Sequence, residues 1–172
     1  IVANADSINA QADGPIASDY ADYAADIANA GRHLLGLVDD LVDLQAIERP
    51  DFALAVEPID LADVGRRAAG LLAVRASQAG VVMAKPGLDE HCPARGDFRR
   101  ALQIVVNLAG NALRYSPKGA SIAVQVHCSD GRARLVVVDQ GKGIAPEDQA
   151  RIFDKFERID PSEVGGNGLG LY

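Results

Sequence analysis

Two amides and a guanidinium on one helix-forming segment are suited to bind a metal ion and phosphate. In NLAGNALRYSP, residues 107–117, Asn107, Asn111 and Arg114 recur at helical spacing and fall along one side of the helix. Solvated helix faces usually carry Glu and Lys, which favour the helix more than Asn does. A carboxamide oxygen suits a hard cation such as Mg²⁺, which shares phosphate oxygens and keeps several waters. From the residues alone, this site and an ordinary solvated face both stay open.

Two glycine-rich stretches follow at intervals along the chain. In DQGKGI, residues 139–144, Gly141 and Gly143 would let the backbone approach a flat ligand, and Asp139 would accept a hydrogen bond from an exocyclic amine. The plainer interpretation is a turn. GGNGLGLY, residues 165–172, offers backbone N–H groups to an anion or is simply a flexible loop. It lacks the GK[ST] of a Walker A loop and is not the dinucleotide fingerprint.

The first part of the chain is patterned as a helical hairpin. Apolar residues repeat every seven positions over residues 18–48, in the rows Tyr20, Ile27, Leu34, Leu41 and Tyr23, Ala30, Leu37, Leu44. Residues 1–11 read as the tail of a preceding helix, joined by a turn at 12–18. Two such helices make half of a four-helix bundle, which a homodimer would complete.

After Pro50 the pattern changes to strands alternating with helices, so the fold class is α+β. Asp60 is placed to cap a helix that Gly80 ends. The D-G pair in SDGR, between two apolar runs, predicts a β-hairpin. The expected strands are 52–59, 81–84, 92–95, 121–128 and 132–139, and the expected helices are 61–79, 97–116 and 146–156.

Composition limits the partners. The formal net charge of −7 over 172 residues argues against nucleic acid and anionic membrane surfaces as partners. No apolar run approaches the ~20 residues that span a bilayer, and no signal peptide is visible. Cys92 and Cys128 show no CxxC spacing, so we expect two reduced thiols in a cytoplasmic protein. The chain begins without Met and reads as a fragment, so a membrane anchor elsewhere in the parent protein stays open.

The motifs together resemble those of sensor histidine kinases. NLAGNALRYSP, DQGKGI, FDKFER (153–158) and GGNGLGL occur in the order and spacing of that family's N, G1, F and G2 boxes. Residues 22–48 resemble the second helix of its dimerisation and phosphoacceptor domain. The resemblance implies a partial helical hairpin over residues 1–49, half of a dimeric four-helix bundle. It also implies an α/β sandwich of the histidine kinase and gyrase type over residues 50–172, C-terminally incomplete, which binds ATP.

The same resemblance implies roles for single residues. Asn111 would coordinate the Mg²⁺ that bridges the ATP phosphates, with Asn107 in support. Asp139 would bind the adenine amino group, which selects adenine because guanine carries a carbonyl there. Arg114 stands where the family usually has Lys and would approach the phosphates. The implied nucleotide-binding set is Asn107, Asn111, Arg114, Tyr115, Asp139, Gly141, Gly143, Arg158, Gly166, Gly168 and Gly170, and its metal ligand is Asn111.

The implied reaction moves the γ-phosphate of MgATP to a histidine and then to an aspartate of a response-regulator receiver domain. The acceptor motif, H-[ED]-x-x-[TN]-P, is absent from the chain. His33 lies in the segment that matches the second helix, whereas the family's acceptor is on the first, and His91 and His127 look structural. We therefore expect no catalytic residue here, an acceptor a few residues upstream, and no autophosphorylation by this chain alone.

Two other interpretations stay open. One is a catalytically degenerate dimeric scaffold or phosphotransfer adaptor with the same fold. The other is an ATPase of the gyrase or mismatch-repair type, although those proteins lack the heptad-patterned helix that precedes the ATP-binding part here. Retention of Asn111, Asp139 and the glycines favours ATP binding.

Overall fold

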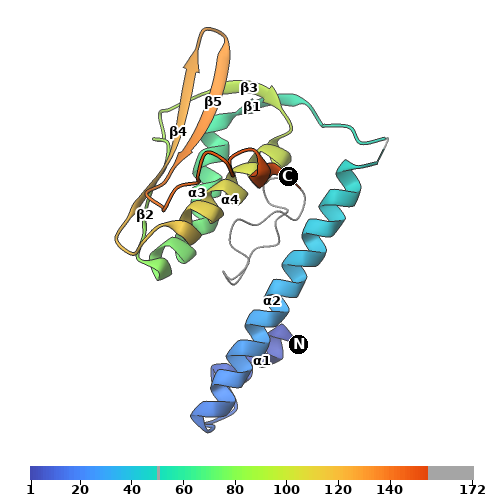
Figure 1. Cartoon of the computed structure of the whole chain (residues 1–172), viewed down its shortest axis with the longest axis vertical. Helices are drawn as coiled ribbons and strands as arrows, with labels where there is room; N and C mark the ends of the chain where they lie inside the picture. The colour runs from blue at the N-terminus through green and yellow to red at the C-terminus, as the bar shows by residue number, and fades with distance from the viewer. Residues whose placement is uncertain (50, 155–172) are drawn as a thin grey trace.

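A helical hairpin and an α/β unit make up the part of the chain that the computed structural model describes, residues 1–49 and 51–154. Helix α1 (Val2–Asn9) lies beside the N-terminal half of the long helix α2 (Ser18–Ile47), and the C-terminal half of α2 leads to the α/β unit (Figure 1). Both predicted helices are confirmed to within two residues. No helix among the described residues is long and apolar enough to cross a membrane.

Helices α1 and α2 meet through small side chains. Ala5 of α1 and Ala24 and Ala28 of α2 are buried. A Cβ atom added at Gly31 would lie 2.6 Å from Cγ2 of Val2, so any larger residue there would require Val2 to move. The Arg32 guanidinium donates to both carboxylate oxygens of Asp6, each at 2.9 Å. The hairpin is therefore closely packed along one side of α2.

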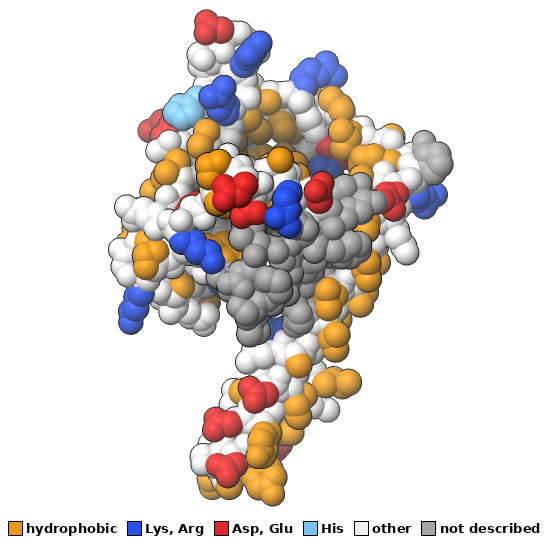
Figure 2. Space-filling view, viewed as in Figure 1, with side chains coloured by type: hydrophobic (Ala, Val, Ile, Leu, Met, Phe, Trp, Pro, Cys, Tyr) orange, Lys and Arg blue, Asp and Glu red, His pale blue; other side chains and the backbone are white. Residues whose placement is uncertain are grey.

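Most of the heptad-spaced side chains of α2 are exposed, whereas Leu37 and Leu44 have intermediate exposure. Leu34 is 61% exposed. Orange apolar side chains follow α2 along much of its visible length in Figure 2. The exposed large apolar residues of this stripe are Tyr20, Tyr23, Ile27, Leu34, Leu35, Val38, Leu41 and Val42.

The α/β unit contains two small sheets and two helices. Strands β1 (Glu57–Asp60) and β3 (Pro93–Gly96) form an antiparallel pair. In the second sheet, β4 (Ser121–Ser129) lies between β2 (Val82–Ala84), which is parallel to it, and β5 (Arg132–Val138), which is antiparallel. Helices α3 (Leu61–Ala79) and α4 (Phe98–Tyr115) pack side by side against this sheet (Figure 1).

Local signals fix most of these boundaries as predicted. The Asp60 side chain caps α3 by accepting from the Ala62 N–H at 2.9 Å, and Gly80 ends the helix with φ of +67°. Asp97 caps α4 by accepting from the Arg100 N–H at 3.1 Å. In the β4–β5 turn, Asp130 and Gly131 both have positive φ, as a two-residue hairpin turn requires.

The strand predicted over 52–59 is only partly correct, because β1 begins at Glu57. Its partner β3 ends at Gly96, opposite Glu57, and Asp97 then begins the α4 cap. Residues 52–56 thus have no strand beside them in that register, and the Ala55 N–H donates to Asp97 Oδ2 instead. The helix predicted over 146–156 is reduced to a short 3₁₀ turn at Arg151–Phe153, and its last residues lie outside the described part.

The expectation of two reduced cysteines is wrong. Cys92 and Cys128 form a disulfide, with their Cα atoms 5.7 Å apart. The disulfide joins residues 36 positions apart in the sequence, so no local sequence pattern predicts it. Only the fold brings the segment before β3 beside the end of β4.

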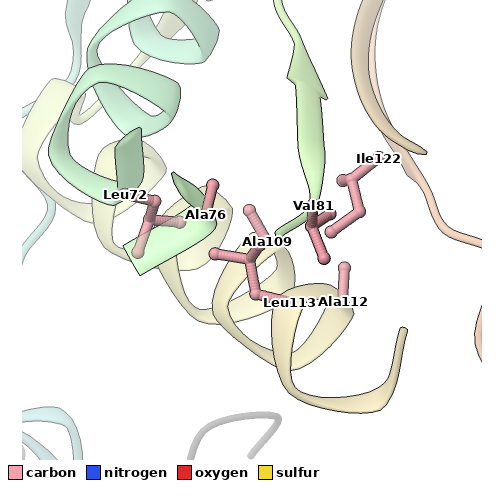
Figure 3. Close-up of a cluster of buried hydrophobic side chains, with 7 residues drawn as sticks. All are labelled: Leu72, Ala76, Val81, Ala109, Ala112, Leu113 and Ile122. Atoms are coloured by element: carbon pink, nitrogen blue, oxygen red, sulfur yellow. The ribbon is translucent and has the colours of Figure 1, made fainter. Parts of the chain in front are cut away.

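The core lies between the helices and the three-stranded sheet. Figure 3 shows side chains from α3, α4 and β4 converging with Val81. Ile122, on β4, is fully buried in this cluster. A second cluster of Val64, Ala68, Val105 and Val124 continues it. Helix α4 is therefore held by its apolar face, and its Asn107–Asn111–Arg114 line points away from the most buried positions.

Candidate functional site

The polar line of α4 is half-buried. Asn107, Asn111 and Arg114 all have intermediate exposure, whereas Ile104 on the same helix is 58% exposed. The line extends toward the N-terminus of α4 through Arg100, whose Nη1 donates to Gln103 Oε1 at 2.9 Å. The polar line thus lies between the buried face of α4 and its most exposed positions, and its binding role stays a prediction.

The loop after β5 lies directly against the C-terminal end of α4. A Cβ atom added at Gly141 would be 3.0 Å from the Tyr115 carbonyl oxygen and 2.8 Å from Asp139 Oδ1. No side chain fits between the loop and the helix end there. Gly141 therefore allows the loop to pack closely on Tyr115, and the approach to a flat ligand that the sequence predicts stays a prediction.

Asp139 is the exposed carboxylate of this loop. Its Oδ1 accepts from the Gly141 N–H at 2.7 Å, which fixes the side chain over the loop. An ionised carboxylate has about four lone-pair positions, so the bond leaves capacity for a further donor. The neighbouring Gln140 ties the loop to the sheet, because its Oε1 accepts from the Ser121 N–H at 2.8 Å. Asp139 is thus a positioned acceptor.

Two cations surround the Tyr115 ring. The Arg114 guanidinium carbon lies 5.8 Å from the ring centroid, and the Lys142 Nζ lies 5.5 Å from it. Both distances allow cation–π attraction, which holds the two positive groups near the polar line of α4. Lys142 was missed by the sequence reasoning, although a cation between Gly141 and Gly143 was a visible signal. Gly143 itself has φ of +73°, which favours glycine.

These groups fit a nucleotide with its metal. The loop beside the end of α4 carries a carboxylate that suits an amine donor. The cations Arg114 and Lys142 suit phosphates, and the asparagines of α4 have carboxamide oxygens that suit Mg²⁺. Within the described residues, no cluster of three His, Cys, Asp or Glu side chains is arranged to hold a metal. The buried Ser116 Oγ, next to Tyr115, has no hydrogen-bond partner among these residues, and an ordered water or ligand could satisfy it.

The structure brings four residues of the predicted set together. Arg114, Tyr115, Asp139 and Gly141 meet where α4 ends, and Asn111 lies one helical turn earlier. Asn107 precedes it by another turn. The remaining predicted residues lie outside the described part of the chain: Arg158, Gly166, Gly168 and Gly170.

A separate charged cluster surrounds Asp60 at the start of α3. Partial burial alone would raise the pKa of Asp60. The Cys92 N–H, the His91 ring and the Ala62 N–H hydrogen-bond to its carboxylate, and together they lower that pKa to about 2. Arg66 Nη2 lies 3.6 Å from the same carboxylate. This cluster holds the segment before β3 on α3 and lies apart from the Asp139 loop in the fold.

Acid should weaken this cluster in a defined pH range. The pKa of Asp60 is near 2 in the folded chain against an ordinary value of 3.8. The stabilisation is therefore complete above about pH 4 and is lost as the pH falls toward 2. Asp60→Asn keeps a good helix cap and removes the charge. Urea unfolding from pH 2 to pH 7 should show a shallower acid loss for this variant, and equal slopes in both proteins would contradict the assignment.

Residues 96–172 match the family model described as histidine kinase-, DNA gyrase B- and HSP90-like ATPase. The chain is 35% identical over 171 residues to the histidine protein kinase DivJ of Caulobacter vibrioides, covering 99% of this chain and 29% of that protein. It therefore spans less than a third of the length of this relative.

Two solved structures are also similar. The crystal structure of full-length ShkA in complex with AMPPNP has a TM-score of 0.72 and 30% identity, and the match covers 92% of this chain and 33% of that one. The mycobacterial sensor histidine kinase MprB has a TM-score of 0.56 and 32% identity, and the match covers 67% of this chain and 72% of that one. The first similarity extends over most of the chain, and the second over two thirds of it.

Proposed function

Since the chain belongs to the sensor histidine kinases, we propose that it is the ATP-binding and dimerisation part of an enzyme that phosphorylates a histidine. The observation that carries this proposal is the junction of the α4 end with the Asp139–Gly143 loop, which gathers an acceptor, cations and a close backbone approach. An adaptor that had lost ATP binding would have no need of this combination. The domain boundaries proposed are residues 1–49 and 50–172.

Each group has a role in holding the nucleotide. Asp139 accepts a hydrogen bond from the adenine amino group, and Gly141 and Gly143 shape the loop beside it. Asn111, supported by Asn107, supplies a carboxamide oxygen to Mg²⁺, and Arg114 approaches the phosphates. Tyr115 lines the pocket, while Arg158 and the glycines at 166, 168 and 170 are included by resemblance alone. When bound, MgATP supplies the phosphoryl group, and the protein contributes mainly positioning and charge neutralisation.

The chain's partners follow from the same premise. The exposed apolar stripe of α2 supports a homodimer, because two copies would cover it and complete a four-helix bundle. The phosphoryl acceptor is a histidine outside this chain, since His33 lies in α2, which matches the second helix of the family's hairpin. The next acceptor is an aspartate in a response-regulator receiver domain.

Nucleotide titration tests the proposal. The chain should bind ATP in a Mg²⁺-dependent manner, and Asn111→Ala should weaken that binding by about tenfold or more, which corresponds to about 1.4 kcal/mol. Isothermal titration with and without Mg²⁺ gives both quantities. Ile104→Ala, an exposed change on the same helix, is the matched control and should bind as wild type does. A chain without Mg²⁺-dependent affinity, or an Asn111→Ala variant equal to wild type, would favour the scaffold interpretation.

A further inference from the structure

The Cys92–Cys128 disulfide joins the two sheets of the α/β unit. Cys92 immediately precedes β3, which pairs with β1 in the small sheet. Cys128 lies near the end of β4, the central strand of the larger sheet. The bond therefore fastens the small sheet to the large one.

The small sheet is also where the chain arrives from the hairpin. Helix α2 ends at Ile47, and the segment that follows leads into β1. Strand β3 continues into α4 through the Asp97 cap, whose Oδ2 accepts from the Ala55 N–H at 3.1 Å. The β1–β3 pair is thus the mechanical junction between the helical hairpin and the ATP-binding domain.

Noncovalent contacts hold the Cys92 segment to α3 and β1. The Cys92 N–H donates to Asp60 Oδ1 at 2.8 Å, and the Leu61 N–H donates to the Cys92 carbonyl oxygen at 2.9 Å. Arg66 Nη1 donates to the carbonyl oxygens of Gly87 and Glu90, at 2.8 and 3.1 Å. These hydrogen bonds hold the segment to α3 and β1, whereas the disulfide links it to β4.

The two cysteines differ in access. Cys92 is 1% exposed, whereas Cys128 is exposed on β4. Cys128 is therefore the more accessible of the two residues to a thiolate from solvent, and thiol–disulfide exchange depends on which sulfur is attacked and on access to it.

We propose that Cys92–Cys128 is a thiol-exchange site that sets how firmly the β1–β3 sheet, and with it the chain arriving from α2, is held on β4. A small thiol, as its thiolate, attacks Cys128 Sγ, and the disulfide bond breaks. The electron pair passes to Cys92 Sγ, which leaves as a thiolate and takes up a proton. A second thiol resolves the mixed disulfide on Cys128, so two small thiols become one small disulfide and the protein gains two thiols.

The nucleotide site should be largely insensitive to this exchange. Helix α4 is fixed by Val105, Ala109, Ala112 and Leu113, which are buried against α3 and β4 without any contribution from the disulfide. Thiol–disulfide exchange thus loosens the β1–β3 junction. It leaves the Asp139 loop in place, because the Gln140 side chain holds that loop to the Ser121 N–H.

Amide hydrogen exchange of the full chain, air-oxidised and then treated with dithiothreitol, tests the proposal. Exchange is followed at the Leu61 and Cys92 amides, which we call the reporters because their hydrogen bonds hold the junction. The Ala109 amide in α4 is the reference. Reduction should accelerate exchange at both reporters by about tenfold or more and at Ala109 by less than about twofold. A matched variant, Cys128→Ser, should exchange quickly at the reporters and respond no further to the dithiol.

Three outcomes would overturn it. Mass analysis of the oxidised chain could show no disulfide, or reduction could leave the reporters unchanged. Hydrogen exchange at Ala109 could also rise by the same factor as at Leu61, which would mean that the disulfide stabilises the whole domain and not the junction. The measurement uses no nucleotide, so its failure is separate from failure of ATP binding. If Cys128→Ser does not fold, reduction of the wild-type chain still decides.

Discussion

Replacing Asp139 by alanine should weaken ATP binding by about 30- to 100-fold, which corresponds to about 2–3 kcal/mol. A hydrogen bond to a charged acceptor contributes more than a neutral one, and the removed carboxylate also holds the loop through the Gly141 N–H at 2.7 Å. Selectivity should fall as well, because the acceptor that distinguishes the adenine amine from the guanine carbonyl is gone. Titration with ATP and GTP measures both effects.

Two variants control this result. Asp139→Asn keeps an acceptor oxygen and should lose less affinity than Asp139→Ala. Glu147→Ala changes an exposed carboxylate farther along the same loop region and should bind ATP as wild type does. If Asp139→Ala lost no more affinity than Glu147→Ala, the adenine-binding role of Asp139 would have to be abandoned.

Replacing Ile122 by alanine should reduce the free energy of unfolding by about 3–4 kcal/mol. Ile122 is 0% exposed and lies between α3, α4 and the residue before β2, so truncation leaves a cavity that two packed helices cannot easily close (Figure 3). Urea unfolding followed by circular dichroism gives the change from the midpoint at constant slope.

The matched control for that cavity is Val82→Ala on the neighbouring strand. Val82 is 65% exposed, so its truncation should cost less than about 1 kcal/mol. Equal losses for Ile122→Ala and Val82→Ala would mean that the helix–sheet cluster is not the centre of stability.

Sequence reasoning succeeded where a local signal decides the structure. Asp60 and Gly80 mark both ends of α3, and the D-G pair marks the β4–β5 turn, because caps and turns depend on a few neighbouring residues. It failed at 52–56, where an apolar run looks like a strand but lacks a partner. Strand formation depends on the register of a distant segment, which no window of the sequence contains.

The candidate site shows the same division. The helical spacing of Asn111 and Arg114 is visible in the sequence, and so are the glycines of the following loop. The contact between Gly141 and the Tyr115 carbonyl is not, because it depends on where β5 ends relative to α4. The cysteine pairing was missed for the same reason, since Cys92 and Cys128 meet only through the fold.

The glycine contact between α1 and α2 has a mechanical consequence. With Gly31 against the Val2 side chain, the two helices approach more closely at this point than a larger residue would allow without a shift of Val2. Helix α2 has 30 residues, so it is about 45 Å long. A small tilt of α2 at the end where it joins α1 therefore displaces its other end, where the ATP-binding domain is attached, by a larger distance.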